Sequence, residues 1–596
     1  MNKRIGLRAI AMMLLLVLAL APLAAQNYQK VFSIDAEEYE ALCYLYIDQG
    51  LSYPSSSGPW SAAELSMMLS KIRRSDLSDA MRSVYDFVDE SIEDVENHRV
   101  SDTLAMSYDN TVSLEGYFHT NTDNYNSEEL WRYDFEERRS MYNGDFETWA
   151  GDMFYGDFDI DLKLNQFGDT NDSSALFGDS AITTNLLMVP PSTLNDLNMN
   201  IPYQAYGSIG GEHWNLQAGR DNLQWGSGVT GNLMLGGHLD YQDMVKFTTF
   251  HDNYKFTQVY SFFTHPMNYL PNTVEAGGAA VDALSPSGQG DVMDGIRMFI
   301  AHRLEFRMFE DLLNFTLSES MMYMSEENTW NLGLLNPFMI YHDNYIRANS
   351  NSLLSLEIET TPINNWSAYG QLVLDEFPLP GEPSSGSGTN PTALGYLAGI
   401  KTAYPVGAGV LYGMLEGAHT DPYLYLRGDG LSVDDQDYGD IGINYVVGLR
   451  SFTPSGNISI AEDFIGYEYG CDAIVLNLTG GYKVFNKFYV EGTLFYMLHG
   501  INDLHTLWDE GADGADDPSQ YITPNTNSTG NILTSGEAKD SIETTLLLEV
   551  KGGYHILPNL EVYGQVDFVN KTNFNNVAAN GTQADTQVSI GTSLSF

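Results

Sequence analysis

The chain has 596 residues, of which 43% are hydrophobic and 12% aromatic, and its formal net charge is −51 at pH 7. Such an acidic chain repels nucleic acid, so we expect no nucleic-acid partner. The hydrophobic fraction is low for a helical membrane protein, but it is ordinary for a β-barrel with a polar lumen.

Residues 1–25 have the pattern of a secretory signal peptide. Lys3, Arg4 and Arg8 form a positive segment, residues 9–20 are apolar, and the small residues before Ala25 suit cleavage after it. The apolar run is shorter than the about 20 residues that a membrane-spanning helix needs. We therefore expect an exported chain that enters a membrane only as a closed barrel. Removing the three basic residues changes the net charge from −51 to −54.

Residues 26–105 are predicted to form a small domain of three amphipathic helices. Asp35 and Glu38 fit a capping box before the first helix, which Gly50 ends. Ser61 and Glu64 fit a second capping box, and apolar residues at helical spacing predict a third helix over 77–95. Such a domain can fold alone, dock on the barrel, or plug its periplasmic mouth.

From residue 106 to residue 596 the apolar period is two, which predicts a closed antiparallel transmembrane β-barrel of 16–18 strands. Two segments, 480–492 and 552–564, share a Gly-Gly-Tyr spacing around a two-residue turn. We interpret these as short periplasmic hairpins. Long Gly-, Ser- and Pro-rich segments such as 378–392 and 500–541 would then form the extracellular loops.

The last strand alternates cleanly. Residues 588, 590, 592, 594 and 596 give one apolar face, and the residues between them are small or polar. The C-terminal aromatic Phe596 resembles the terminal residue by which outer-membrane proteins are presented to the barrel-assembly machinery. It therefore predicts a multi-pass barrel in the outer membrane, with lipid and lipopolysaccharide or an equivalent around it.

No motif in the chain predicts catalysis, a cofactor or a metal site. There is no G-x-S-x-G elbow, no H-E-x-x-H helix, and no ligand spacing among the 12 histidines. Residues 226–231 match G-x-G-x-x-G, but the alternating strand before them excludes a dinucleotide fold. The acidic loops at 434–440 and 509–517 are interpreted as solvated, and the Arg-Gly-Asp at 427–429 as coincidence. Cys43 and Cys471 could form a disulfide in an exported protein, but Cys43 lies mid-helix in an apolar pattern, which favours a buried free thiol.

A set of motifs resembles the Wzi-type capsule assembly proteins. The segment 219–235 is similar to the G-R-x-x-x-x-W-G-x-G…N-L-x-L segment of that family, with Ser227 at the position of its usual proline. The segments 301–305, 317–319, 335–338, 349–351 and 374–377 follow in the family's order. The motif residues singled out are Gly219, Arg220, Trp225, Gly226, Gly228, His302, Arg303, Asn336 and Pro337.

The resemblance implies an outer-membrane barrel whose periplasmic end is occluded by an N-terminal helical bundle. It also implies a lectin-like, non-enzymatic role in capsule or other surface polysaccharide assembly and attachment. We expect the motif residues to be structural, with Trp225 packed at a strand-end turn and Arg220 in an ion pair in the lumen. Trp508, in the longest loop, is the expected glycan contact, or else an anchor of that loop to the rim.

Two other functions fit the same barrel. A porin or substrate-selective channel would conduct solutes through the polar lumen and favour cations. A surface adhesin would use the long loops. The position of residues 26–105 distinguishes a plugged barrel from an open one.

Overall fold

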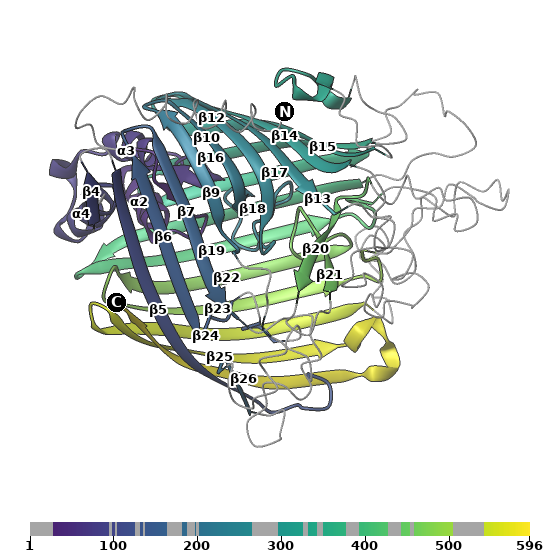
Figure 1. Ribbon diagram of the computed structural model, residues 1–596. Coiled ribbons are helices and arrows are strands. Elements are labelled where there is room, and N and C mark those ends of the chain that lie inside the picture. Colours follow the sequence, from purple (N-terminus) through teal and green to yellow (C-terminus); the bar gives the residue numbers. More distant parts are fainter. Residues whose placement is uncertain are drawn as a thin grey trace, which may run out of the picture.

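The computed structural model of the chain is a closed antiparallel β-barrel with a group of helices at one end (Figure 1). It describes residues 28–93, 98–101, 104–125, 131–134, 137–163, 182–186, 197, 202–264, 296–325, 332–342, 350–376, 393–426, 443–452, 458–504 and 542–596.

Eighteen long strands of the described residues form the wall, at the upper end of the predicted 16–18. Each pairs antiparallel with its neighbours, and β26 closes the barrel against β5, where Val588 lies opposite Phe118. The wall strands are β5 (Leu104–His119), β6 (Tyr142–Ala150), β7 (Phe154–Leu162), β9 (Ala205–Gly211), β10 (Trp214–Asp221), β12 (Gln242–His251), β13 (Tyr254–Phe263), β14 (Ile296–Met308), β15 (Leu313–Ser325), β16 (Ser350–Ile363), β17 (Trp366–Glu376), β18 (Ala393–Val406), β19 (Gly409–Thr420), β22 (Ala473–Val484), β23 (Phe488–His499), β24 (Glu543–Leu557), β25 (Leu560–Thr572) and β26 (Thr582–Ser595).

Shorter elements join the wall or lie inside it. β4 (His98–Ser101) and β8 (Ile182–Thr184) pair with β5. Three two-stranded pairs are separate from the wall: β1 (Val31–Phe32) with β3 (Trp60–Ser61), β2 (Ser57–Gly58) with β11 (Gln224–Trp225), and β20 (Val446–Phe452) with β21 (Ile458–Phe464). The short 3₁₀ turns are η1 (Arg74–Asp76), η6 (Leu332–Leu335), η7 (Phe574–Asn576) and η8 (Ala578–Asn580).

The outer face of the wall is apolar and the inner face polar. On β26, Ile590 and Leu594 are exposed on the outside while Gln587 and Ser589 are buried inside, which confirms the predicted alternation. The same alternation exposes large hydrophobic side chains on every wall strand from β12 to β19, as expected where lipid surrounds a barrel. Among the described helices, none is long and apolar enough to cross a membrane.

The hairpins at one end of the barrel are short. Asn486 and Lys487 lie in the turn between β22 and β23, and Pro558 and Asn559 join β24 to β25. The two predicted turns are therefore confirmed. β26 runs toward the same end, since Leu594 pairs with Leu560 at the start of β25.

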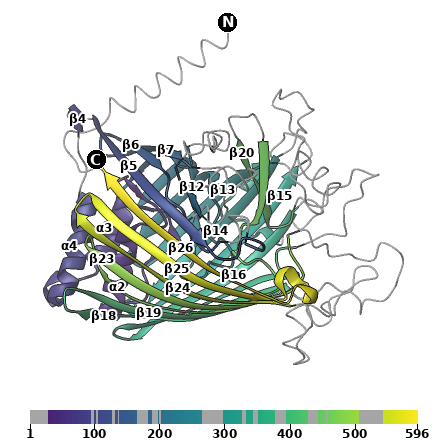
Figure 2. The same ribbon diagram turned by 90° about the horizontal axis from the view of Figure 1, so that it is seen from below.

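Three helices lie at this short-turn end, on the inner side of the wall (Figures 1 and 2). They are α2 (Glu37–Gln49), α3 (Ala62–Ser70) and α4 (Asp79–Glu93). The backbone N–H of Asn365, in the β16–β17 turn, donates to Ile47 O at 2.7 Å. Ser52 N donates to Asp311 O, in the β14–β15 turn, also at 2.7 Å. The helical segment is thus docked on the turns of the barrel rather than separate from it.

One of the two predicted capping boxes is wrong. The N-cap of α2 is Ala36, whose side chain cannot accept a hydrogen bond, and no side chain caps this helix. The cap of α3 is confirmed, because Glu64 N donates to Ser61 Oγ at 3.3 Å. The Glu64 carboxylate does not return to the cap, however, since it pairs with Lys255 of the wall. Gly50 ends α2 in the left-handed region, at φ 74°, as predicted.

Candidate functional site

The motif segment 222–241 connects β10 to β12 by passing through the barrel lumen. Trp225 is fully buried there, and β11 pairs with β2 of the N-terminal segment. Gly226 N donates to Ser56 O at 2.9 Å, which continues this pairing. Trp225 therefore packs in the interior against the N-terminal segment and is inaccessible to a large ligand.

Two glycines of the motif are required by backbone geometry. Gly226 has a φ of 123°, and a Cβ there would collide with the side chains of Asn232 and Gln371. A Cβ on Gly228 would collide with the carbonyl oxygen of Gly231. The G-x-G spacing thus serves a tight internal loop, and no phosphate is needed to explain it.

A wall carboxylate anchors this loop. Glu416 of β19 accepts hydrogen bonds from Val229 N at 2.7 Å, Thr230 N at 2.8 Å and Thr230 Oγ1 at 2.5 Å. Tyr369 of β17 donates to the same carboxylate at 2.6 Å. Buried backbone N–H groups are costly without acceptors, so Glu416 stabilises the loop in this position.

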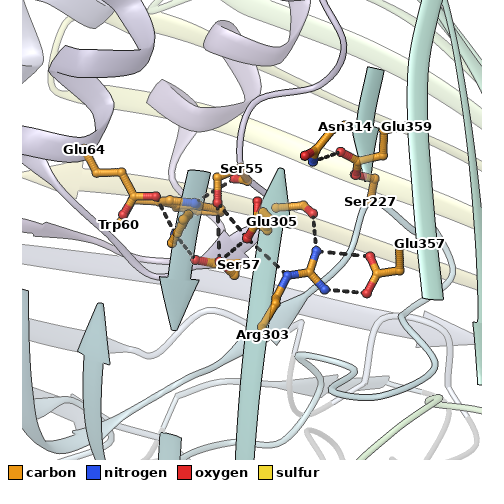
Figure 3. A network of polar contacts seen from close by, with 12 residues as sticks. Ser55, Ser57, Trp60, Glu64, Ser227, Arg303, Glu305, Asn314, Glu357 and Glu359 are labelled. Atoms are coloured by element: carbon orange, nitrogen blue, oxygen red, sulfur yellow. Dashed lines mark hydrogen bonds and ion pairs between the residues drawn. The ribbon is translucent and has the colours of Figure 1, made fainter. Parts of the chain in front are cut away.

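Arg303 of β14 is the centre of a buried polar network (Figure 3). Its Nε lies 3.1 Å from Glu305 Oε1 on the same strand, and its Nη atoms bind Glu357 of β16 in a bidentate pair. Nη2 also donates to Ser56 Oγ at 3.0 Å. Ser57 of the N-terminal segment donates to Glu305 at 2.7 Å. All three nitrogens of the guanidinium thus have partners, and the side chain joins two wall strands to the segment in the lumen.

A second ion pair continues the network toward the helices. Lys255 of β13 pairs with Glu64 of α3 and donates to Ser57 O at 2.8 Å. Burial raises the pKa of the Glu64 carboxyl, and the charge of Lys255 opposes this shift. Lys246 of β12 donates to Pro59 O at 2.5 Å. Three wall cations therefore hold the N-terminal segment in the lumen.

Described residues of the connection between β19 and β22 also lie in the interior of the barrel, beside the motif segment. Tyr425, Tyr445 and Tyr467 of this connection are fully buried. Thr230 Oγ1 lies 2.8 Å from Tyr467 OH, and Tyr425 OH donates to Leu233 O. The motif segment and this connection form one apolar cluster with the inner wall.

The prediction that Arg220 forms an ion pair in the lumen is wrong in its location. Arg220 does pair with Asp243 of β12, at 2.9 and 3.0 Å, and its guanidinium stacks on Tyr241 at 3.9 Å. Both charged residues are in phase with the outward residues of their strands, since Arg220 is six positions from the exposed Trp214 of β10 and Asp243 is four positions from the exposed Phe247 of β12. The strand register places Arg220 opposite Asp243 on the outer side of the sheet, beside Gly219, whose φ is 139°.

His302 also lies on the outer side, next to inward-facing Arg303. Its Nε2 is 3.3 Å from Glu319 of β15, and its ring stacks on Tyr341 at 4.8 Å. Asn336 and Pro337 belong to the segment 332–342 that carries Tyr341. Adjacent residues of the His-Arg motif therefore have separate partners, one outside the wall and one in the lumen.

A cavity of about 500 Å³ remains between α2 and the wall strands β19 and β22–β26. Three ion pairs surround it: Lys483 with Glu37 and Glu40, Lys551 with Glu491, and Arg139 with Glu561. Four tyrosines also line it, namely Tyr133, Tyr412, Tyr489 and Tyr563. The cavity lies beside the helices, at the short-turn end, with both charged and aromatic side chains in its lining.

Some predicted residues cannot be placed. Trp508, the acidic loops 434–440 and 509–517, and the tripeptide 427–429 lie outside the described residues. Phe596 is described: it is exposed on the outside, and its N–H donates to Asn110 O at 2.9 Å. Within the described part of the chain, no group of three or more His, Cys, Asp or Glu residues is arranged to hold a metal ion.

Sequence reasoning missed the partners of the motif residues. Glu357, Glu416 and Ser56 are each far from the motif in sequence, and each lies in an unremarkable stretch. One feature of the sequence could have singled out Glu357. It lies on the inner face of an alternating strand, and a charged residue there needs a buried partner. Nothing in the sequence specifies which partner it is.

Comparison with known proteins gives the same class of fold. No family model and no curated protein matches the chain. Among solved structures, it is similar to Wzi of Escherichia coli, an outer-membrane protein involved in group 1 capsule assembly and described as a carbohydrate-binding β-barrel. That match has a TM-score of 0.52 and 12% identity over 95% of this chain and 99% of Wzi.

Weaker matches are other outer-membrane proteins, of which DcaP is described as a channel. DcaP of Acinetobacter baumannii has a TM-score of 0.33 and 9% identity, over 84% of this chain and 100% of that chain. OpdK of Pseudomonas aeruginosa has a TM-score of 0.33 and 9% identity, over 82% of this chain and 99% of that chain. The chain thus has the fold of an outer-membrane β-barrel. The predicted resemblance to the Wzi-type family is confirmed in fold.

Proposed function

We propose that this protein is a non-enzymatic outer-membrane barrel that holds a surface polysaccharide at the cell exterior. The observation that carries the proposal is the packing of chain segments inside the lumen. The N-terminal segment pairs with the motif segment, and the motif segment packs with the β19–β22 connection inside the wall. Arg303 and Glu416 join these segments to the wall.

Chain segments packed inside the lumen favour a binding role because conduction needs a continuous aqueous path. The buried ion pairs at Arg303 and Lys255 cross from the wall to the N-terminal segment. Removing one partner of such a pair leaves a buried charge and costs about 3–5 kcal/mol, so spontaneous opening of this contact is rare. The role of Wzi as a carbohydrate-binding barrel with this fold supports the same proposal.

The glycan would be bound on the side opposite the helices. Aromatic side chains there would pack on the C–H faces of sugar rings while neighbouring polar groups form hydrogen bonds. Trp508, between Leu507 and Asp509 in the connection from β23 to β24, is the proposed contact. Catalysis is not part of the proposal, since no catalytic motif is present in the sequence.

A selective channel is the second candidate, and the 500 Å³ cavity favours it. The cavity lies beside α2 and is lined by polar residues of β22–β26, including Gln565 and Ser589. A narrow path past the helices along these strands would let small solutes cross. This candidate predicts measurable conductance in the intact protein.

Two measurements on the purified full chain distinguish these functions. Under the first proposal, planar bilayers show little steady conductance, and isolated surface polysaccharide binds the protein. A Trp508→Ala variant should bind more weakly, whereas the control Trp366→Ala, an exposed tryptophan of the short-turn end, should bind normally. Large steady conductance without polysaccharide binding would reject the glycan role and support the channel.

A cellular test is independent of the purified protein. Deleting the gene should release surface polysaccharide into the medium while its synthesis continues. Unchanged cell-associated polysaccharide in the deletion strain would contradict the proposal.

A further inference from the structure

Three polar side chains face outward at the mid-length of neighbouring strands. His302 is the seventh of the 13 residues of β14, and Glu319 is the seventh of the 13 residues of β15. They lie directly opposite each other, and Gln258 of β13 lies opposite His302 on the other side. The residues two positions away on these strands are mostly large and apolar. The polar cluster of Gln258, His302 and Glu319 therefore lies where the middle of the bilayer is expected.

Polar and ionisable groups at that depth are costly when they face lipid. Here the segment 332–342, from the connection between β15 and β16, covers the cluster. Tyr341 stacks on His302 at 4.8 Å, and Gln258 Nε2 donates to Tyr341 OH at 3.2 Å. Leu334 and Tyr341 pack with Met298, Ile300, Met321 and Tyr323 of the outer wall.

Glu319 is the main hydrogen-bonding anchor of the segment. Its Oε2 accepts from Tyr341 N at 2.9 Å and its Oε1 accepts from His342 N at 2.8 Å. His302 Nε2, on the neighbouring strand β14, also lies 3.3 Å from Glu319 Oε2. Both oxygens of the carboxylate are thus engaged by groups of the segment and of β14.

The backbone of the segment is arranged for an environment without water. Asn336 N donates to Gly333 O at 3.1 Å, Phe338 N to Asn336 Oδ1 at 3.1 Å, and Met339 N to Asn336 O at 3.2 Å. Pro337 has no N–H, and the amides of residues 341 and 342 bind Glu319. At the six positions 336–339, 341 and 342 there is therefore no N–H left for solvent. The Asn336-Pro337 pair of the motif accounts for four of these six positions. Two are Asn336 and Pro337 themselves, and at the other two, 338 and 339, the N–H donates to Asn336.

The outer side of the segment is apolar. The side chain of Phe338 is 84% exposed, that of Ile340 57%, and that of Leu335 42%. The ring centroid of Phe338 also lies 6.0 Å from that of Phe256, on the outer face of β13. The segment thereby continues the apolar outer surface of the wall. A loop in water rarely exposes three such side chains together.

We propose that the segment 332–342 is a membrane-embedded latch, fastened to the outer wall by Glu319, with Phe338 and Ile340 in contact with lipid acyl chains. The occupant of the outer side is lipid because the exposed side chains there are apolar, and the N–H groups of residues 336, 338, 339, 341 and 342 are bonded within the segment or to Glu319. A protein partner at membrane depth would be expected to use hydrogen-bonding groups as well as apolar contact, and this surface offers apolar side chains. The proposal holds whether or not the protein binds a glycan.

Site-directed spin labelling of the full chain in phospholipid vesicles tests the position of Phe338. A nitroxide at Phe338→Cys should collide often with oxygen and rarely with a water-soluble nickel complex, as expected in hydrocarbon. The lipid control is Ile358→Cys, 50% exposed on the outer face of β16, and the water control is Phe309→Cys, 72% exposed in the β14–β15 turn. The wild-type chain, whose two cysteines are buried, gives the unlabelled background.

The result at position 338 has one supporting and two opposing outcomes. Collision rates like those at position 358 support the latch. Frequent nickel collisions, as at position 309, would place the segment in water. Low collision rates with both reagents would place it against another protein. Either of the last two results overturns the proposal.

Removing the anchor tests the role of Glu319. In Phe338→Cys/Glu319→Ala the amides of Tyr341 and His342 lose their acceptor, so the label should become more mobile and more accessible to nickel. The matched control Phe338→Cys/Glu310→Ala changes an exposed glutamate of the short-turn end and should leave the label unchanged. An unchanged spectrum in the Glu319→Ala variant, with heat-modifiable gel migration retained, would reject Glu319 as the anchor.

Discussion

Arg303 of β14 donates a hydrogen bond of 3.0 Å to the hydroxyl of Ser56, which ties the barrel wall to the segment between helices α2 and α3. The same guanidinium binds Glu305 and Glu357, so the contact is part of a closed network of charges. The N-terminal segment is therefore not a loosely attached domain. It is built into the lumen by groups that cannot be separated without exposing a buried charge.

The first prediction concerns this network. Replacing Arg303 by alanine leaves Glu305 and Glu357 buried without their shared cation, and should lower the free energy of unfolding by about 3–5 kcal/mol. Urea unfolding in detergent, followed by loss of the heat-modifiable gel band, measures the change.

The control for Arg303→Ala is Arg74→Ala. Arg74 pairs with Asp86 at 2.6 Å, but both side chains are exposed, so its loss should not change unfolding measurably. Equal midpoints for the two variants would contradict a structural role for the Arg303 network.

The second prediction concerns Gly226. A Gly226→Ala variant must adopt a φ near 123° and place its Cβ against Asn232 and Gln371. Backbone strain of about 1–3 kcal/mol adds to an overpacking cost of similar size. The folded yield after refolding into detergent should fall sharply.

Gly581→Ala is the matched control for this substitution. Gly581 also has a positive φ, of 60°, but a Cβ added there would meet no atom within 4 Å. That variant should lose about 1–3 kcal/mol from the backbone alone, since its ψ of −137° is also unfavourable for a residue with a Cβ. If both variants refold equally well, close packing around Gly226 does not explain the motif.

The general plan of the molecule could be predicted from periodicity. The alternation over 586–596 indicated both the strand β26 and its outward face, because a barrel strand has one lipid side and one lumen side. Helices α2 to α4 followed from spacing in the same way. These features depend only on residues near one another in the chain, so one sequence is enough to find them.

The contacts of the motif residues could not be predicted, because they depend on how the barrel closes. Arg220 was expected in the lumen, yet the register with Asp243 places it on the outer side. Arg303 and His302 are adjacent, and only the structure separates the inner network from the outer latch. The expected cap at Asp35 failed for a local reason, since α2 begins after Ala36 with no side-chain acceptor.

The third prediction concerns the two cysteines. Cys43 and Cys471 are free and buried, as the sequence predicted, and burial raises the pKa of both thiols. The thiolate is the reactive form, so neither should react with a maleimide in the folded protein. Mass spectrometry should show no added label before unfolding and two labels after it. A single label, or none, after unfolding in the absence of reductant would indicate oxidation and contradict two free thiols.

The fourth prediction concerns Phe596. Its side chain is 66% exposed on the outer face at the short-turn end, and its amide donates to Asn110 O at 2.9 Å, beside the strand pair that closes the barrel. The exposed ring adds little to the folded core, so its importance should lie in assembly. Deleting Phe596 should slow membrane insertion in cells while the inserted protein keeps nearly the same unfolding midpoint.

The control is Phe568→Ala, which removes another outward phenylalanine from the neighbouring strand β25 and should insert at the normal rate. Pulse-chase labelling with the heat-modifiable band as readout measures both rates, and equal rates for the two variants would show that the terminal aromatic is not an assembly signal.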